Sequence, residues 1–216
     1  MRARVAKHAL LLALALLLPV RGRADVLEEF WPEVDAWYSF SETTRMLLTA
    51  SGKRSREDGE KGDAELALYV DYRPSKRISF RAGYLQTIDS KEEADPGERR
   101  ALFDFNYRWY FGDSIELADR SRLEFRDLGE DDTVRIRNRL RIERAMKVRE
   151  HPIAPYATLE AYYDDRYQTV SRWRIETGFT IPTGRHLEWD FYLGWQHDLR
   201  PESTHVSGFG ITLNVK

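Results

Sequence analysis

Apolar and polar residues alternate one by one along most of the chain from about Arg45 onward. In one such segment Leu66, Leu68 and Val70 alternate with Tyr69 and other positions on the opposite side. A period of two predicts β-strands, because successive side chains of an extended chain point to opposite faces. No segment of comparable length shows a helical period, so the sequence predicts an all-β fold.

Short turn sequences and longer charged stretches alternate between these segments. Pro74-Ser75-Lys76 and Pro182-Thr183-Gly184 are short turns, whereas residues 55–63 and 89–99 are long and charged. This alternation is typical of the periplasmic turns and extracellular loops of an outer-membrane barrel. Residues 45–216 are therefore predicted to form a transmembrane antiparallel up-and-down β-barrel with both ends in the periplasm. About ten strands are expected, at residues 45–54, 64–73, 76–87, 100–111, 114–126, 133–145, 155–163, 170–181, 186–197 and 205–215.

Residues 25–44 form a separate N-terminal segment in this interpretation. Within it, Val34–Phe40 also has the pattern of a strand, and including it makes the strand count odd. Three explanations stay open. The segment plugs the lumen, it extends the first strand beyond the membrane, or it belongs to a barrel of twelve strands, since bacterial single-chain barrels have an even number.

The two faces of the alternating segments differ in composition. The apolar face is rich in aromatic residues, and the other face carries rows of charge. A soluble sandwich or a small-ligand barrel would have to bury all those aromatic rings inside, whereas a membrane barrel places them in its lipid band and interfacial girdles. The sequence favours lipid on the apolar face. The charged ladder on the lumen face is predicted to comprise Arg120, Arg122, Glu124, Arg126, Arg135, Arg137, Arg139, Arg141, Glu143, Arg172, Arg174 and Glu176.

The charged ladder admits two functional interpretations. Charges held away from bulk water need partners, and barrels of about eight strands are filled by their own side chains. An ion-paired, filled lumen is therefore favoured. Rings of Arg also select for anions, so a narrow passage that favours anions is the alternative. The sequence thus predicts a charged lumen in an outer-membrane barrel of unassigned activity, with a structural role or a narrow passage.

Residues 1–24 have the features of a cleaved secretory signal. Arg2, Arg4 and Lys7 precede an apolar run at residues 9–20, and Ala24 ends a small-residue cleavage motif. The apolar run has about twelve residues, fewer than the roughly 20 that a membrane helix needs. The chain is therefore expected in the cell outer membrane after export through the inner membrane.

The end of the chain carries a further signal for that location. Phe209, Ile211, Leu213 and Val215 alternate up to the last residues, which resembles the terminal strand by which outer-membrane barrels are recognised for assembly. The expected partners are accordingly the barrel-assembly machinery and outer-membrane lipid.

Composition narrows the chemistry further. The 34 Lys and Arg nearly balance the 36 Asp and Glu, which argues against nucleic acid as a partner. The chain has no cysteine, so disulfides, thiolate chemistry and Cys-ligated zinc are not available to it. Its five histidines show no metal-ligand spacing. Neither a metal nor a cofactor is expected, and the chain is expected to be a monomer.

An outer-membrane hydrolase, of protease or lipase type, is the alternative function. A histidine with carboxylates can activate water, and loops at one end of a scaffold are the usual place for such sites. His205 and Ser207 occur near one strand start but define no catalytic pair. The candidate loop site comprises Asp132, Asp164, Asp165, His197 and Asp198.

Two neighbouring Arg-rich segments carry a family resemblance. Residues 119–126 and 135–144, together with Trp37-Tyr38-Ser39-Phe40, Ala82-Gly83-Tyr84 and residues 155–163, resemble the bacterial family called domain of unknown function 2490. The resemblance runs over nearly all of the chain after residue 24. It implies an outer-membrane β-barrel of unassigned activity and assigns no catalytic residue.

Overall fold

The computed structural model describes residues 29–55, 63–88, 97–129, 132–198 and 203–215. The predicted signal at residues 1–24 lies outside the described residues. So do the side chains of Phe209, Ile211, Leu213 and Val215, of which only the backbone is described. The strands are β1 (Glu29–Ser39), β2 (Thr44–Ser55), β3 (Asp63–Tyr72), β4 (Ile78–Ile88), β5 (Arg99–Phe111), β6 (Ile115–Asp127), β7 (Asp132–Arg144), β8 (Met146–Val148), β9 (His151–Asp164), β10 (Thr169–Thr183), β11 (Leu187–Asp198) and β12 (Ser203–Val215).

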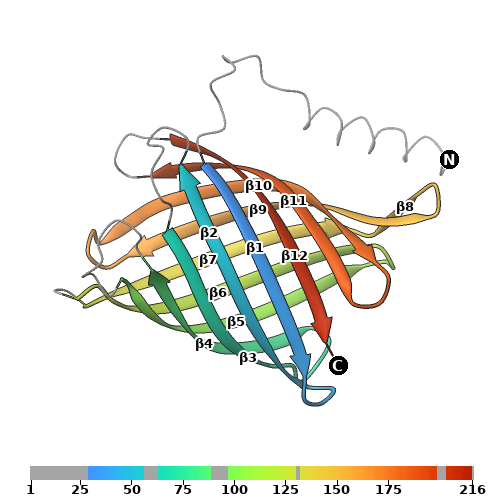
Figure 1. Ribbon diagram of the computed structural model, residues 1–216, viewed down its shortest axis with the longest axis horizontal. Coiled ribbons are helices and arrows are strands. Elements are labelled where there is room, and N and C mark those ends of the chain that lie inside the picture. The colour runs from blue at the N-terminus through green and yellow to red at the C-terminus, as the bar shows by residue number, and fades with distance from the viewer. Residues whose placement is uncertain (1–28, 56–62, 89–96, 130–131, 199–202, 216) are drawn as a thin grey trace.

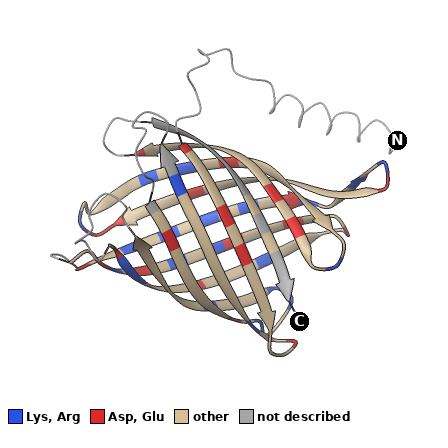
Figure 2. Cartoon of the chain, in the orientation of Figure 1, with Lys and Arg blue, Asp and Glu red and all other residues tan. Residues whose placement is uncertain are grey.

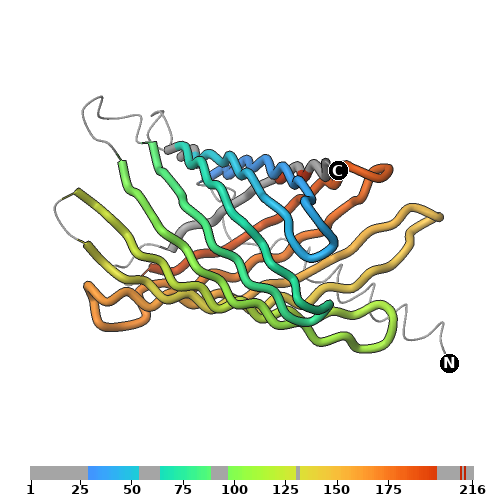
Figure 3. The backbone as a smooth tube through the Cα atoms, turned by 90° about the horizontal axis from the view of Figure 1, so that it is seen from below, coloured from blue at the N-terminus to red at the C-terminus, as the bar shows by residue number. Residues whose placement is uncertain are grey.

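These strands form one curled sheet in which consecutive strands run up and down (Figures 1 and 3). The alternation in the sequence explains the strands, and the tight turns explain where they reverse. Gly112 and Gly184 occupy turns with φ of 63° and 70°, a backbone conformation that glycine adopts without steric cost. The ten predicted segments correspond to β2–β7 and β9–β12, so the all-β, antiparallel prediction is confirmed.

The order of pairing returns to its first strand. Each strand from β1 to β7 pairs with the next, β7 pairs with β9, and β9 to β12 follow in order. The short β8 continues β7 along the same edge of β9, because Glu143 pairs with Tyr156 and Met146 with Ile153. Finally β12 pairs with β1 in parallel, with Glu33 opposite Gly210. Every strand except β8 therefore has two neighbours among the described residues.

The structure adds β1 to the ten predicted strands. The segment that contains Val34–Phe40 is neither a plug nor half of an unseen pair, because β1 pairs with β2 and β12. Eleven strands thus follow one another in the pairing order, β8 being the continuation of β7. In an up-and-down sheet of odd count the first and last strands run in the same direction, which explains the parallel pair. The start of β1 and the end of β12 lie at opposite ends of the sheet (Figure 1), whereas an even number of strands would place them at the same end.

The convex face of the curled sheet is apolar and exposed. Leu66, Leu68 and Val70 on β3 expose 48–50% of their surface, and Ile142 on β7 exposes 51%. Figure 2 shows charged positions at intervals along the strands. The largest fully buried side chains on the concave face are charged: Asp104, Glu124 and Asp164. Carboxylates are almost never fully buried unless they are paired, and each of these three binds an arginine.

One small apolar cluster lies on the concave face. It comprises Leu47, Ala67, Tyr69, Leu85 and Leu102, with Trp37 packed against it. Gly83 permits the close packing of Tyr69, since a Cβ at this position would lie 2.2 Å from Tyr69 Cδ1. Among the described residues there is no helix long and apolar enough to cross a membrane.

Candidate functional site

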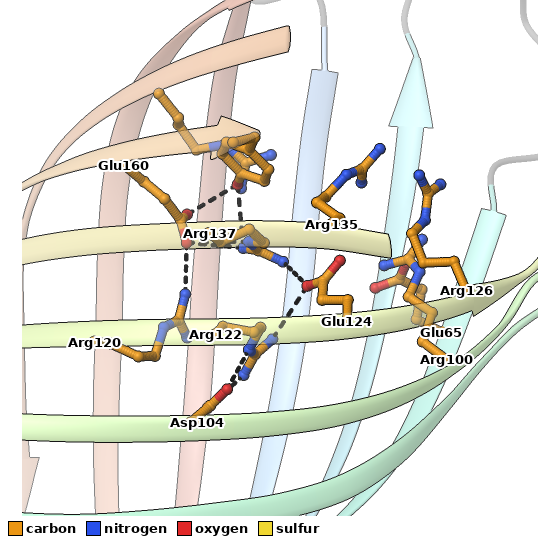
Figure 4. A network of polar contacts seen from close by, with 12 residues as sticks. Glu65, Arg100, Asp104, Arg120, Arg122, Glu124, Arg126, Arg135, Arg137 and Glu160 are labelled. Atoms are coloured by element: carbon orange, nitrogen blue, oxygen red, sulfur yellow. Dashed lines mark hydrogen bonds and ion pairs between the residues drawn. The ribbon is translucent and has the colours of Figure 1, made fainter. Parts of the chain in front are cut away.

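Charged side chains from four neighbouring strands meet on the concave face and form what we call the central network (Figure 4). Strands β5, β6, β7 and β9 each present every second residue to this face, so their inward positions lie in adjoining rows. The pairing register places Asp104 opposite Arg122, and Arg139 opposite Glu160. The central network comprises Asp104, Arg120, Arg122, Glu124, Arg137 and Glu160.

Arg137 joins two carboxylates in this network. Its Nη1 donates to Glu124 Oε1 at 2.8 Å, and its Nη2 donates to Glu160 Oε1 at 3.0 Å. Glu160 also accepts hydrogen bonds from two other residues, from Arg120 Nη2 at 2.6 Å and from the Tyr162 hydroxyl at 2.9 Å. The guanidinium of Arg137 also lies 4.5 Å from the centroid of the Tyr162 ring. Glu160 is therefore bound by two guanidinium groups and a hydroxyl at once.

Arg122 and Asp104 form a deeply buried pair. Two parallel hydrogen bonds join them, from Nε at 2.7 Å and from Nη2 at 2.9 Å. The side chains expose 7% and 1% of their surface. Such a paired fork fixes geometry as well as charge, and loss of one member would leave the other charged and desolvated.

A second group, the rim network, lies where the long connections begin. Asp164 accepts from Arg135 Nη2 at 2.8 Å and from Arg126 Nη1 at 3.1 Å. Arg126 also binds Glu98, and Arg100 Nη2 binds Glu98 at 2.7 Å. Burial alone would raise the pKa of the Glu98 carboxyl, but the hydrogen bonds from Arg100 and Arg126 outweigh it and lower that pKa to about 2.

The rim network predicts acid sensitivity. Because the pKa of Glu98 is lower in the folded chain than its ordinary value of 4.5, the ionised carboxylate stabilises the fold above about pH 4.5. That contribution is lost as the pH falls through the folded pKa. We expect Glu98→Gln to reduce the slope of unfolding free energy against pH between about 4.5 and 2, measured by urea titration in detergent. An unchanged slope would show that Glu98 is not bound in this way.

A third group of charged side chains surrounds Asp71, whose carboxylate is shared by three arginines. Arg81 Nε lies 2.6 Å from it, Arg45 Nη2 3.2 Å and Arg73 Nη2 3.9 Å. Arg45 also stacks on the Trp37 ring, 3.4 Å from its centroid. The three groups together line the concave face of β2 to β7 and β9 with paired charge.

The remaining concave surface, on β1, β10 and β11, is acidic. Thr49 donates to Asp35 at 2.6 Å, Tyr156 donates to Asp190 at 2.9 Å, and Thr158 donates to Glu176 at 3.1 Å. These donors are neutral hydroxyls. Among the described residues, Arg174 is the one cation within ion-pair distance of these carboxylates, with its Nη1 3.8 Å from Glu176 Oε1. We call Glu33, Asp35, Glu176 and Asp190 the acidic wall.

A comparison with protein families finds one match. The sequence profile described as "Protein of unknown function (DUF2490)" matches residues 28–206, from just before β1 into the start of β12. The chain belongs to the DUF2490 family. The family description names no activity. Searches of curated proteins and of solved structures return no match.

In this DUF2490 chain the predicted ladder lies on the concave face. Besides the central and rim networks, Arg141 pairs with Glu143 at 2.7 Å and Arg172 pairs with Asp198. Arg174 donates to Gln196 Oε1 at 2.6 Å. Of the ladder's arginines, only Arg139 has no hydrogen bond and no ion pair within 4.0 Å among the described residues.

Two tyrosines that were not among the predicted site residues also lie on this face. Tyr156 and Tyr162 are buried and donate to carboxylates. The signal was present in the alternation, because both share the parity of Glu160 on β9. An aromatic residue on a charged face is the feature that could have identified them as part of the site.

The structure does not bring the five residues of the candidate loop site together. Asp164 and Asp198 point inward and are bound by arginines. His197 has the opposite parity and stacks on Trp195, with ring centroids 5.7 Å apart. Asp132 pairs across strands with Asp127, and Asp165 is exposed in the turn between β9 and β10. Among the described residues no group of three or more His, Asp or Glu could hold a metal ion.

Proposed function

We propose that this DUF2490 chain is a closed eleven-stranded barrel that spans the outer membrane and carries a narrow, charge-lined passage. The observation that carries the proposal is the inverted polarity of the sheet. Exposed apolar side chains cover its convex face, whereas its concave face buries Asp104, Glu124 and Asp164. A spanning barrel must satisfy every backbone group internally, and the cyclic pairing of the long strands among the described residues supports such a barrel.

The lengths of the strands fit this role. β5, β6 and β7 have 13 residues each, and a tilted transmembrane strand needs about 9–11. The apolar rows of neighbouring strands coincide, since Leu68 pairs with Leu48 on one side and with Tyr84 on the other. A continuous apolar band of this kind supports contact with lipid hydrocarbon.

The interior supports a restricted passage. Eleven strands lie between the barrels of about eight strands that side chains fill and those of 16–18 strands that hold a wide channel. The central and rim networks occupy the space along β5 to β9, and their charges neutralise one another. A wide anion-selective pore would need several unpaired arginines in that region, and Arg139 is the one ladder arginine without an ion pair among the described residues. We therefore propose a narrower route along the acidic wall.

Location and assembly belong to the same proposal. The signal at residues 1–24 would deliver the chain to the periplasm, and the barrel-assembly machinery would insert it. Each long strand has two neighbours within the described part of the chain, so none of these strands offers a free edge to a second copy. The proposed state is therefore a monomer surrounded by outer-membrane lipid.

The test uses the full chain expressed with its leader in a Gram-negative host. We expect it in the outer-membrane fraction, soluble only in detergent, and migrating as a compact species on gels until heated. In planar bilayers we expect a small unit conductance. Recovery of a folded chain from the periplasm without detergent would contradict the membrane role, and a large porin-like conductance would contradict the narrow passage.

A further inference from the structure

Two oppositely charged side chains on the concave face lack a partner. Glu33 on β1 and Arg139 on β7 have neither a hydrogen bond nor an ion pair within 4.0 Å among the described residues. Every carboxylate of the central and rim networks, by contrast, binds at least one arginine. Glu33 is exposed and Arg139 is half-buried, so both face space that a water molecule can reach.

The two residues lie on opposite sides of the interior. Counted along the pairings, β7 is five steps from β1 through β12, β11, β10 and β9, and six steps through β2 to β6. In a ring of eleven strands these are the most distant positions. Glu33 shares the parity of Asp35 on β1, and Arg139 shares that of Arg137 on β7, so both side chains face the interior. The two groups also lie within electrostatic range of each other.

Mainly carboxylates surround Glu33, whereas charges of both signs surround Arg139. Glu33 lies within electrostatic range of Asp35, Glu176 and Asp190, the other members of the acidic wall. Arg139 lies within range of Arg122 and Arg141, and also of Glu160 and Glu176. Arg120 stands opposite it on β6 and Glu160 opposite it on β9. The buried Arg120 Nε has no hydrogen-bond partner among the described residues. Among the described residues, the unpaired guanidinium of Arg139 thus stands across the interior from the unpaired carboxylate of Glu33.

We propose that Glu33 and Arg139 bind the two ends of a zwitterionic solute, an ammonium carboxylate, inside the barrel. The carboxylate of the solute would accept hydrogen bonds from the Arg139 guanidinium, whose fork matches its geometry. Its ammonium group would lie among Glu33, Asp35 and Asp190. A simple anion would be repelled by the acidic wall and a simple cation by the arginines, whereas a zwitterion complements both sides without adding net charge.

This inference deepens the proposed passage by naming its solute class, and its test does not require passage. The full chain, folded in detergent, is titrated with the ω-amino acids from glycine to 6-aminohexanoate and followed by saturation-transfer NMR. Butyrate and butylammonium serve as one-charge probes matched to 4-aminobutyrate. We expect one member of the zwitterion series to bind at least about tenfold more tightly than either one-charge probe.

Variants assign the binding to the two residues. Glu33→Gln and Arg139→Gln are each expected to weaken zwitterion binding about tenfold or more. The double exchange Glu33→Arg with Arg139→Glu should restore much of it, since the solute can bind in the reverse direction. Arg108→Gln removes an interior arginine paired with Glu116 and is the matched control, expected to leave binding unchanged. Heat-modifiable migration verifies that each variant is folded.

The outcomes separate the two proposals. Equal binding of all probes, or no binding of any zwitterion by the folded wild type, overturns this inference even if the chain inserts and conducts. Loss of binding in Arg108→Gln to the same extent as in Arg139→Gln also overturns it. A folded chain that binds a zwitterion but stays out of membranes would instead contradict the proposed function and leave the binding site standing.

Discussion

Replacement of Glu160 by glutamine is expected to lower the free energy of unfolding by about 3–5 kcal/mol, the usual loss when one partner of a buried ion pair is removed. Glu160 is buried and accepts hydrogen bonds from Arg120, Arg137 and Tyr162. Glutamine keeps the size of the side chain but removes the negative charge. Both guanidinium groups would then stay in the interior with too little compensating charge, because Glu124 is the other carboxylate bound to Arg137.

The control for this variant is Glu188→Gln. Glu188 is half-buried on β11 and has no ion pair within 4.0 Å among the described residues, so we expect a loss below about 1 kcal/mol. Reversible urea unfolding in detergent micelles, followed by tryptophan fluorescence, measures both variants. Equal effects would show that the central network stabilises the chain no more than an unpaired interior carboxylate does.

The division of residues between the two faces could be predicted from the sequence. Alternation decides which side chains share a face, and it needs no knowledge of the neighbouring strand. Leu66, Leu68 and Val70 were therefore assigned to one face and Arg135, Arg137 and Arg139 to the other, and the structure places them so.

The strand count could not be predicted, because it depends on a pairing between distant segments. β1 contains Pro32, Glu33 and Asp35, and its local pattern does not distinguish a plug from a strand. Its role is decided by the parallel register with β12, in which Val34 lies opposite Ile211. A closed up-and-down sheet with an even number of strands contains no such parallel pair.

The partners within the site were also beyond the sequence. Arg137 and Arg139 are two residues apart on the same face of β7, yet Arg137 binds Glu124 and Glu160 whereas Arg139 binds neither. Register and side-chain conformation make this difference, and neither is visible in the alternation. Parity alone did separate His197 from Asp198, and it argues against a joint role for the two in the proposed loop site.

The second large effect is expected on the convex face. We expect Leu68→Arg to lower the free energy of unfolding in lipid vesicles by about 2–4 kcal/mol, the loss found for Arg at the midplane of a membrane barrel. Leu68 lies near the middle of β3, exposes 49% of its surface and touches no concave-face network. In water, the same substitution at an exposed position changes stability by roughly 0.5 kcal/mol or less.

Tyr72→Arg is the matched control for that substitution, because Tyr72 is the last residue of the same strand and is exposed to 51%. Near the interface an arginine costs about 0–1 kcal/mol, so a membrane barrel predicts a clear difference between the two positions. A convex face that contacts water would give the same small effect at both. The depth dependence, rather than the size of either effect alone, therefore tests whether lipid covers the apolar face, and it does so without reference to any solute in the interior.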